Sequence, residues 1–110
     1  MSCIFCKIIK KELPSNIIFE NEDFIAFNDI SPKANTHILL VPKRHIASII
    51  ELPESDAEMM GKMIITAKKI ATNAGLSSYR LVFNSGPDAG QEVPHLHLHL
   101  LGGNELGSIA

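Results

Sequence analysis

The stretch that decides the fold is His95-Leu96-His97-Leu98-His99-Leu100-Leu101, in which histidine and leucine alternate. In a β-strand, successive side chains point to opposite faces. The alternation therefore predicts a strand that carries all three histidines on one face and turns its leucines toward the core. Histidine is an uncommon residue, and three on one face favour a functional site over a solvated strand edge.

Two chemical interpretations of the three histidines compete. A catalytic zinc held by all three would strain the geometry, because His95 and His99 would lie ~13 Å apart along a strand that rises ~3.3 Å per residue, whereas zinc–nitrogen bonds are ~2.0–2.1 Å long. A neutral imidazole, with a pKa of ~6.5, is a nucleophile near pH 7. Its attack on phosphorus gives a covalent intermediate that water then cleaves. We favour a nucleophilic histidine whose neighbours stabilise charge on the phosphoryl oxygens.

Hydrophobic patterning outside this stretch predicts an α+β domain. Apolar residues at helical spacing predict a short helix over 3–11 and a long helix over 56–74. Short apolar runs between turn residues predict five strands, over 16–20, 24–28, 36–41, 79–84 and 93–101. Strands in hairpin-sized neighbours together with one long helix indicate an antiparallel sheet.

Length, charge and hydropathy exclude several classes of protein. The chain has 110 residues, the size of one domain, which we expect to span 1–110. Its net charge is −2 and no basic stretch is longer than Lys43-Arg44, so affinity for nucleic acid is not expected. No apolar run approaches the ~18 residues of a membrane span, and Lys7, Lys10 and Lys11 interrupt any signal-peptide core. We therefore expect a cytoplasmic protein without membrane association.

The triad stretch resembles the His-φ-His-φ-His-φ-φ motif of the histidine triad (HIT) superfamily. The likeness covers nearly the whole chain. Within the superfamily, the chain resembles the branch of histidine triad nucleotide-binding proteins. The matching segments are 4–9, 27–32, 36–45, Asn84, 90–93 and Gly102-Gly103. The resemblance implies a HIT-like fold and a twofold homodimer. It also implies hydrolysis of purine nucleoside phosphoramidates to an amine and a nucleoside 5′-monophosphate, through a nucleotidyl-histidine intermediate and without a catalytic cofactor.

The resemblance also implies roles for individual residues. His97 matches the nucleophile, flanked by His95 and by His99, which would donate to the phosphate. His37 matches a fourth histidine on the proton path to the leaving group. Asp29 matches the carboxylate that accepts both ribose hydroxyls, with Ile30 beside the base. The phosphate would be bound by Asn84 and by the backbone at Gly90, Gln91, Glu92 and Val93. Candidates for the apolar base pocket, each equally plausible as plain core, are Phe5, Ile8, Ile18, Phe27 and Leu39.

Three features depart from the family pattern. Glu92 stands where some relatives have serine, and because a carboxylate would repel a phosphate we expect its side chain to point away. Pro94 stands where an aromatic residue is common, and its missing N–H predicts a strand start or edge. The tail after Gly103 is short and lacks aromatic residues, so leaving-group specificity does not carry over from the relatives.

Cys3 and Cys6 form a C-x-x-C that, in a cytosolic chain, indicates metal or redox chemistry. A thioredoxin-like motif would follow a strand, whereas this one opens the chain. A closed zinc site needs two more ligands, and His45 and His95 are the candidates. The chain resembles some HIT proteins with this C-x-x-C, in which two cysteines and two histidines hold a structural zinc. The alternative is that both cysteines are ordinary small apolar residues.

Two other functions compete with the phosphoramidase. The first is hydrolysis of dinucleoside polyphosphates, with which the loop 86–91 has some similarity. The second is a non-enzymatic module for nucleotide sensing or protein interaction. In each case the expected ligand is a purine nucleotide of the AMP or GMP class. The ending Gly102-Gly103 and the short N-terminus favour the phosphoramidase branch.

Overall fold

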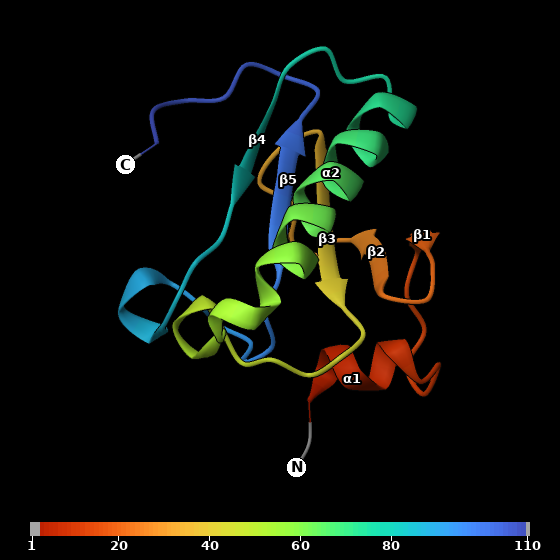
Figure 1. Ribbon diagram of the computed structural model, residues 1–110. Helices are drawn as coiled ribbons and strands as arrows, with labels where there is room; N and C mark the ends of the chain where they lie inside the picture. The colour runs from red at the N-terminus through yellow and green to blue at the C-terminus, as the bar shows by residue number, and fades with distance from the viewer. Residues whose placement is uncertain (1–2, 110) are drawn as a thin grey trace.

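The computed structural model describes residues 3–109 and contains a five-stranded antiparallel sheet with helices on both faces (Figure 1). The strands lie in the order β1-β2-β3-β5-β4, and every adjacent pair is antiparallel. Their bounds are β1 Ile17–Glu20, β2 Phe24–Asn28, β3 Thr36–Pro42, β4 Tyr79–Val82 and β5 Leu98–Gly102. The helices are α1 Ile4–Ile9 and α2 Ala57–Asn73, with short 3-10 helices at Ile49–Glu51, Glu54–Asp56 and Pro87–Ala89. The predicted α+β fold is confirmed.

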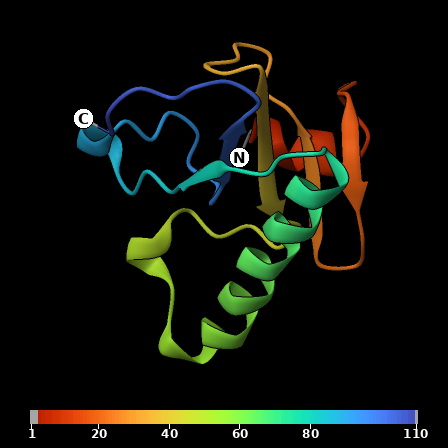
Figure 2. The same cartoon turned by 90° about the horizontal axis from the view of Figure 1, so that it is seen from above.

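The long helix α2 covers one face of the sheet and the short helix α1 covers part of the other (Figure 2). On the α2 face, Met63, Ala67 and Ile70 of the helix pack against buried strand residues such as Leu98 and Leu100. On the opposite face, Phe5 and Ile8 of α1 pack with another set of buried strand residues. That set is Ile25, Phe27, Leu39 and Val41. Each face of the sheet therefore has its own apolar core, and the functional side chains lie on the α1 face.

The histidine–leucine alternation is present, but the strand that carries it is shorter than predicted. Leu96, Leu98 and Leu100 all join the α2-side core, as the alternation requires. The strand β5 begins only at Leu98, not at residue 93. Pro94 has no N–H to donate to a ladder, and the N–H of His95 donates to the Val93 carbonyl oxygen at 2.8 Å in a local bend. Pro94 therefore lies outside the sheet instead of at a strand start or edge.

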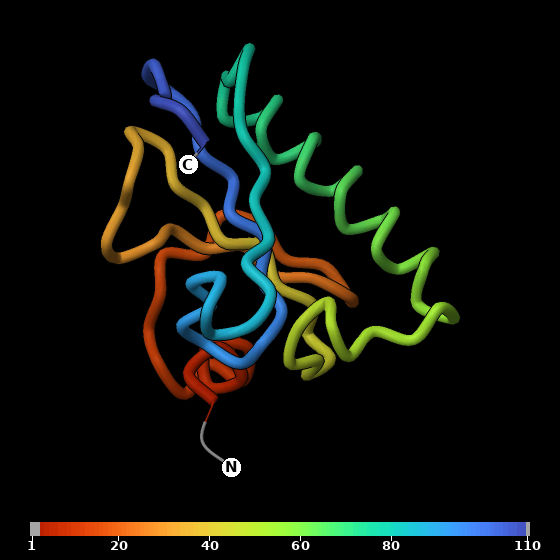
Figure 3. The backbone as a smooth tube through the Cα atoms, turned by 90° about the vertical axis from the view of Figure 1, so that its left-hand side faces the viewer, coloured from red at the N-terminus to blue at the C-terminus, as the bar shows by residue number. Residues whose placement is uncertain are grey.

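The pairing of β3 with β5 brings distant histidines together. Leu39 of β3 lies opposite His99 of β5, and His37 lies opposite Leu101. The chain after β5 turns at Gly103, whose φ of +87° is in the left-handed region that glycine adopts without strain. Figure 3 shows that the segment leading into β5 runs beside α1 at one end of the molecule. This end of the molecule holds the candidate site.

None of the helices in residues 3–109 combines the length and apolar character that crossing a membrane requires.

Candidate functional site

A cavity of about 700 Å³ opens on the α1 face of the sheet, within the size range of small-molecule sites. Its walls come from α1, the end of β2 and the loop after it, β3, β5 and the loop that precedes the triad. Most of the predicted site residues lie in this wall. They are Phe5, Ile8, Phe27, Asp29, Ile30, His37, Leu39, Asn84, Gly90, Glu92, Val93, His97 and His99.

Some predicted residues lie elsewhere or are already engaged. Ile18 is exposed on β1 and Gln91 is absent from the wall, so neither contributes its side chain to the cavity. The N–H groups of Gly90 and Gln91 donate to the carbonyl oxygens of Pro87 and Gly86 at 3.0 and 3.1 Å, closing the turn. Both N–H groups are thus already hydrogen-bonded within the turn, and their binding of a phosphate stays a prediction.

The ring of His97 is held in one tautomer. Its Nδ1 lies 2.7 Å from the carbonyl oxygen of His95. A carbonyl oxygen only accepts, so Nδ1 carries the proton and Nε2 carries the lone pair. His97 is only 7% exposed and packs edge-on against Phe5, yet it lines the cavity. The neutral ring is thus immobilised at the cavity wall with its lone pair on Nε2, as a nucleophile requires.

A second set of hydrogen bonds fixes the tautomers of His37 and His99. The backbone N–H of Lys33 donates to His37 Nδ1 at 3.0 Å, so the proton of neutral His37 is on Nε2. That N–H donates to His99 Nδ1 at 2.9 Å, which leaves the proton of His99 on its own Nε2. His99 therefore has a donor to offer, and it lines the same cavity as His97.

Burial keeps these two histidines neutral. It lowers the pKa of His37, against an opposing effect of the nearby Asp29 carboxylate. It lowers the pKa of His99 to about 4, with the neighbouring His97 and His37 contributing in the same direction. Both rings are therefore uncharged at pH 7, and the tautomers fixed by Lys33 persist there.

The loop after β2 presents Asp29 to the cavity. Its Oδ1 accepts from the backbone N–H of Ser31 at 2.8 Å, and its Oδ2 lies 3.5 Å from His37 Nε2. The next residue, Ile30, is 95% exposed at the edge of the cavity, an apolar side chain without protein cover. Asp29 is thereby oriented by its own turn and keeps lone pairs for a ligand.

Comparisons with known proteins agree with this geometry. Residues 2–108 match the family model described as "Scavenger mRNA decapping enzyme C-term binding". The chain is 44% identical over 106 residues to the purine nucleoside phosphoramidase of Escherichia coli K12. The alignment covers 94% of this chain and 89% of that protein. A HIT family hydrolase from Legionella pneumophila superimposes with a TM-score of 0.94 at 48% identity, covering 96% of both chains. A histidine triad protein from Clostridium difficile superimposes with a TM-score of 0.95 at 41% identity, covering 100% of this chain and 97% of that chain.

The chain belongs to the histidine triad superfamily. It is a hydrolase of that family.

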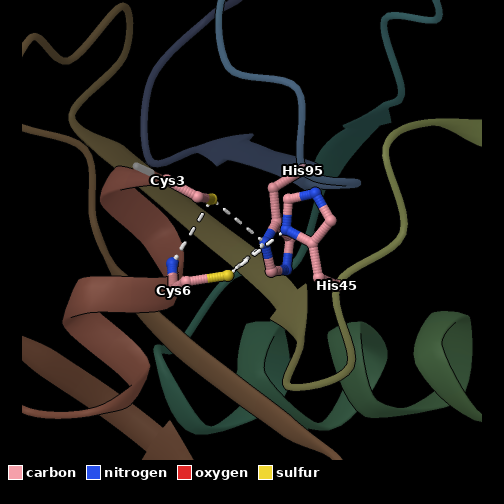
Figure 4. A group of neighbouring side chains, drawn as sticks. All are labelled: Cys3, Cys6, His45 and His95. Carbon is pink, nitrogen blue, oxygen red and sulfur yellow. Dashed lines mark hydrogen bonds between the residues drawn. The ribbon is translucent and has the colours of Figure 1, made fainter. Parts of the chain in front are cut away.

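Beside the cavity, this HIT protein gathers Cys3, Cys6, His45 and His95 at the start of α1 (Figure 4). Cys6 Sγ lies 3.2 Å from His45 Nδ1 and 3.6 Å from His95 Nδ1, and Cys3 Sγ lies 3.5 Å from the same His95 nitrogen. All four atoms lie within 4.8 Å of one another. A tetrahedron with Zn–S of ~2.3 Å and Zn–N of ~2.0–2.1 Å needs its ligand atoms roughly 3.5 Å apart. The four residues therefore fit a zinc ion.

The environment of His95 also fits metal binding. Its Nε2–H donates to the Pro42 carbonyl oxygen at 2.8 Å, so its Nδ1 directs a lone pair toward the two sulfurs. A metal-bound histidine almost always donates its other N–H in this way. His95 is fully buried, and burial lowers its pKa, which keeps the ring neutral as a ligand must be.

A second cluster, Asp29, His37 and His99, also brings its ligand atoms within 4.8 Å of one another. Here the hydrogen bonds oppose metal binding. Because the Lys33 N–H occupies His37 Nδ1, the proton of His37 sits on the nitrogen that faces the cluster. Within residues 3–109, no cluster with metal-ligand spacing joins all three triad histidines. The interpretation of the triad as a single zinc site is therefore not supported.

Sequence reasoning missed part of the site. Lys33 acts through its backbone N–H, and a backbone donor leaves no side-chain pattern to recognise. Wall residues such as Leu13 and Pro14 lie on the connection after α1, which the sequence marks only as a break. The remaining missed wall residues are Ile4, Ser15, Asn28, Ser31, Val82 and Leu101. Val82 and Leu101 have apolar types typical of plain core, so no signal separates them from it.

Proposed function

We propose that this HIT protein hydrolyses the P–N bond of purine nucleoside phosphoramidates, releasing an amine and a nucleoside 5′-monophosphate. The observation that carries the proposal is the His97 ring, held at the cavity wall with Nδ1–H on the His95 carbonyl oxygen and Nε2 unprotonated. The similarity to the Escherichia coli purine nucleoside phosphoramidase supports the substrate class.

In the proposed reaction, His97 Nε2 forms a bond to phosphorus while the P–N bond breaks. The leaving nitrogen keeps the electron pair of the broken bond and takes a proton from solvent. Water then attacks phosphorus, the P–Nε2 bond breaks, and its electron pair returns to His97. The proton taken up in the first step is released in the second, so the enzyme is regenerated. His99 Nε2–H is suited to donate to the phosphoryl oxygens as negative charge builds on them.

The rest of the cavity supplies the proposed binding contacts. Asp29 would accept the ribose hydroxyls through the lone pairs that its turn leaves unused. Phe5, Ile8 and Phe27 form an apolar wall for the purine, and Asn84 adds an amide for the phosphate. His37 holds the His99 tautomer; its part in the proton path stays a prediction. No metal takes part in this reaction scheme.

The charge of the cavity favours an amine over a polyphosphate as the leaving group. Among the wall residues, Lys33 is the only lysine or arginine, whereas Asp29 and Glu92 bring two carboxylates. A dinucleoside polyphosphate expels a nucleotide with several negative charges, which would need more cations than this wall provides.

Side-by-side turnover tests the proposal. Purified protein is given an adenosine 5′-phosphoramidate and a diadenosine polyphosphate, and release of AMP is followed by chromatography. We expect at least tenfold higher kcat/KM for the phosphoramidate. Preference for the polyphosphate would select the other hydrolase, and tight AMP binding with no turnover of either would select the nucleotide-sensing module.

We further propose a structural zinc at Cys3, Cys6, His45 and His95, which the donor set and spacing support. Its place beside α1 would fix the helix to the triad segment. The two cysteines are not joined in a disulfide, which fits a reducing compartment such as the cytoplasm.

We also propose that the protein works as a twofold homodimer. β4 is an edge strand of the sheet, with backbone groups open on one side to pairing by another strand. Ile64 and Ile65 of α2 and Tyr79 of β4 are apolar side chains exposed to solvent in the single chain. Light scattering at micromolar concentration tests the proposal, and a mass of 12.0 kDa would contradict it.

A further inference from the structure

Glu92 is a charged residue at the cavity whose side chain the proposed mechanism does not use. It is exposed and lines the cavity. Each ion pair within residues 3–109 joins other residues, so its carboxylate has no cationic partner in that part of the chain. The cavity wall therefore includes a residue whose carboxylate charge the protein leaves uncompensated. The expectation that this side chain points away from a bound phosphate leaves it free to meet the leaving group instead.

The loop that carries Glu92 is held firmly relative to the nucleophile. The preceding side chain, Gln91, accepts from the Gly86 N–H at 2.9 Å and donates to the carbonyl oxygens of Ala47 and Val93 at 2.7 and 3.0 Å. The Val93 carbonyl oxygen also accepts from the His95 N–H at 2.8 Å. His95 in turn holds the His97 ring. Glu92 thus sits on a hydrogen-bonded segment that ends at the reacting histidine.

The other charged wall residues do not offset Glu92. Asp29 and Lys33 lie on one loop, and Lys33 Nζ donates to the Ser31 carbonyl oxygen of that same loop at 3.3 Å. Glu92 lies on a different segment, where the neighbouring wall residues Gly90 and Val93 are uncharged. His37 and His99 are kept neutral by burial and add no positive charge. A phosphoramidate adds one negative charge, so a positive charge on the amine portion of the substrate would offset part of this negative charge, and a carboxylate there would add to it.

We propose that Glu92 sets the leaving-group specificity of the enzyme, favouring amines that carry a second, protonated amino group over amines that carry a carboxylate. The inference rests on the proposed phosphoramidase function. Opposite charges a few ångströms apart in a partly hydrated cavity attract, and like charges repel, by an amount equivalent to about tenfold in kcat/KM for each substrate. The proposal predicts a graded series from cationic through neutral to anionic amines.

A matched set of three adenosine 5′-phosphoramidates tests this. Their amines are ethylenediamine, n-propylamine and β-alanine, which have similar length and differ in the charge of the far end. For the wild type we expect kcat/KM to fall about tenfold at each step, and the spread to shrink at 1 M salt. For Glu92→Gln we expect the ratio of cationic to anionic substrate to fall to within about threefold of one, and for Glu92→Lys we expect it to invert. Asp88→Asn, in the same loop but outside the wall, is expected to keep the wild-type ratio.

The outcomes separate this inference from the proposed function. A wild type that cleaves all three substrates at similar rates, or a Glu92→Gln variant that keeps the wild-type ratio, overturns the role of Glu92 while the phosphoramidase activity stands. A wild type that cleaves none of the three overturns the proposed function and the inference together. Ratios within one enzyme cancel differences in folding, so a partly unfolded variant still gives a valid answer.

Discussion

His95 and His97 are joined by a 2.7 Å hydrogen bond from the Nδ1–H of His97 to the His95 backbone carbonyl oxygen, while the His95 ring faces Cys3 and Cys6. One residue therefore serves two sites through different atoms. Its backbone selects the tautomer of His97, and its side chain belongs to the cysteine–histidine cluster. Any change that displaces the His95 ring is expected to disturb the His97 ring as well.

Replacement of the nucleophile should separate binding from chemistry. We expect His97→Ala to lower kcat for an adenosine phosphoramidate by about 1,000-fold or more, because the nitrogen proposed to form the covalent intermediate is lost. AMP should still bind, since the base and ribose contacts lie on other elements. Isothermal titration gives the affinity and rapid quench gives the rate. Lys62→Ala, on the exposed face of α2, is the control, and near-normal turnover by His97→Ala would refute the mechanism.

Loss of the cysteine–histidine cluster should lower stability and activity together. Metal analysis of protein purified without chelators should find about one zinc per chain, and Cys6→Ser should lose it. We expect the midpoint of thermal unfolding to fall by about 8 °C or more, equivalent to ~2 kcal/mol for a domain of this size. A chelator should lower the midpoint of the wild type but not of the variant. Protein that is metal-free as purified, with the same midpoint as Cys6→Ser, would contradict the zinc proposal.

The sequence specified much of this architecture because its signals are periodic. The histidine–leucine alternation predicted the two faces of the segment around β5, and apolar spacing predicted α2 within a few residues. It could not predict where β5 begins, because Pro94 and a local bend end the ladder while the alternation of side chains continues. Nor could the sequence predict which loop N–H groups donate hydrogen bonds within the loop itself, as those of Gly90 and Gln91 do, because that depends on the turn geometry.

The proposed ribose contact can be tested with a substrate that lacks the hydroxyls. Asp29→Asn keeps an acceptor for the Ser31 N–H but replaces the carboxylate, so kcat/KM for the ribonucleotide should fall about 10–100-fold, the range for a hydrogen bond to a charged group. The wild type should lose a similar factor on a 2′,3′-dideoxy substrate, whereas the variant should lose little more. Equal sensitivity of both proteins to the missing hydroxyls would place the ribose elsewhere.

The buried pair His37–His99 should make folding stability depend on pH in a defined direction. The pKa of His99 in the folded protein is about 4, below its ordinary value near 6.5, and burial is the main cause. Between pH 6.5 and pH 4, His99 therefore binds a proton in the unfolded chain but stays neutral in the folded protein. Burying neutral His99 therefore costs no stability above pH 6.5. As the pH falls toward 4, proton binding by the unfolded chain lowers the free energy of unfolding. After allowance for the water that reaches this ring, the loss is about 1–2 kcal/mol.

His99→Gln removes this titration while leaving a polar group beside His37. Urea unfolding of both proteins at pH 7.5 and pH 4.5, at equal ionic strength, gives the measurement. The wild type should lose about 1–2 kcal/mol more than the variant between the two values of pH. Release of a metal from the Cys3–Cys6 cluster, and titration of surface carboxylates, occur in both proteins and cancel in this difference. An equal loss in the two proteins would show that His99 is not held neutral by its surroundings.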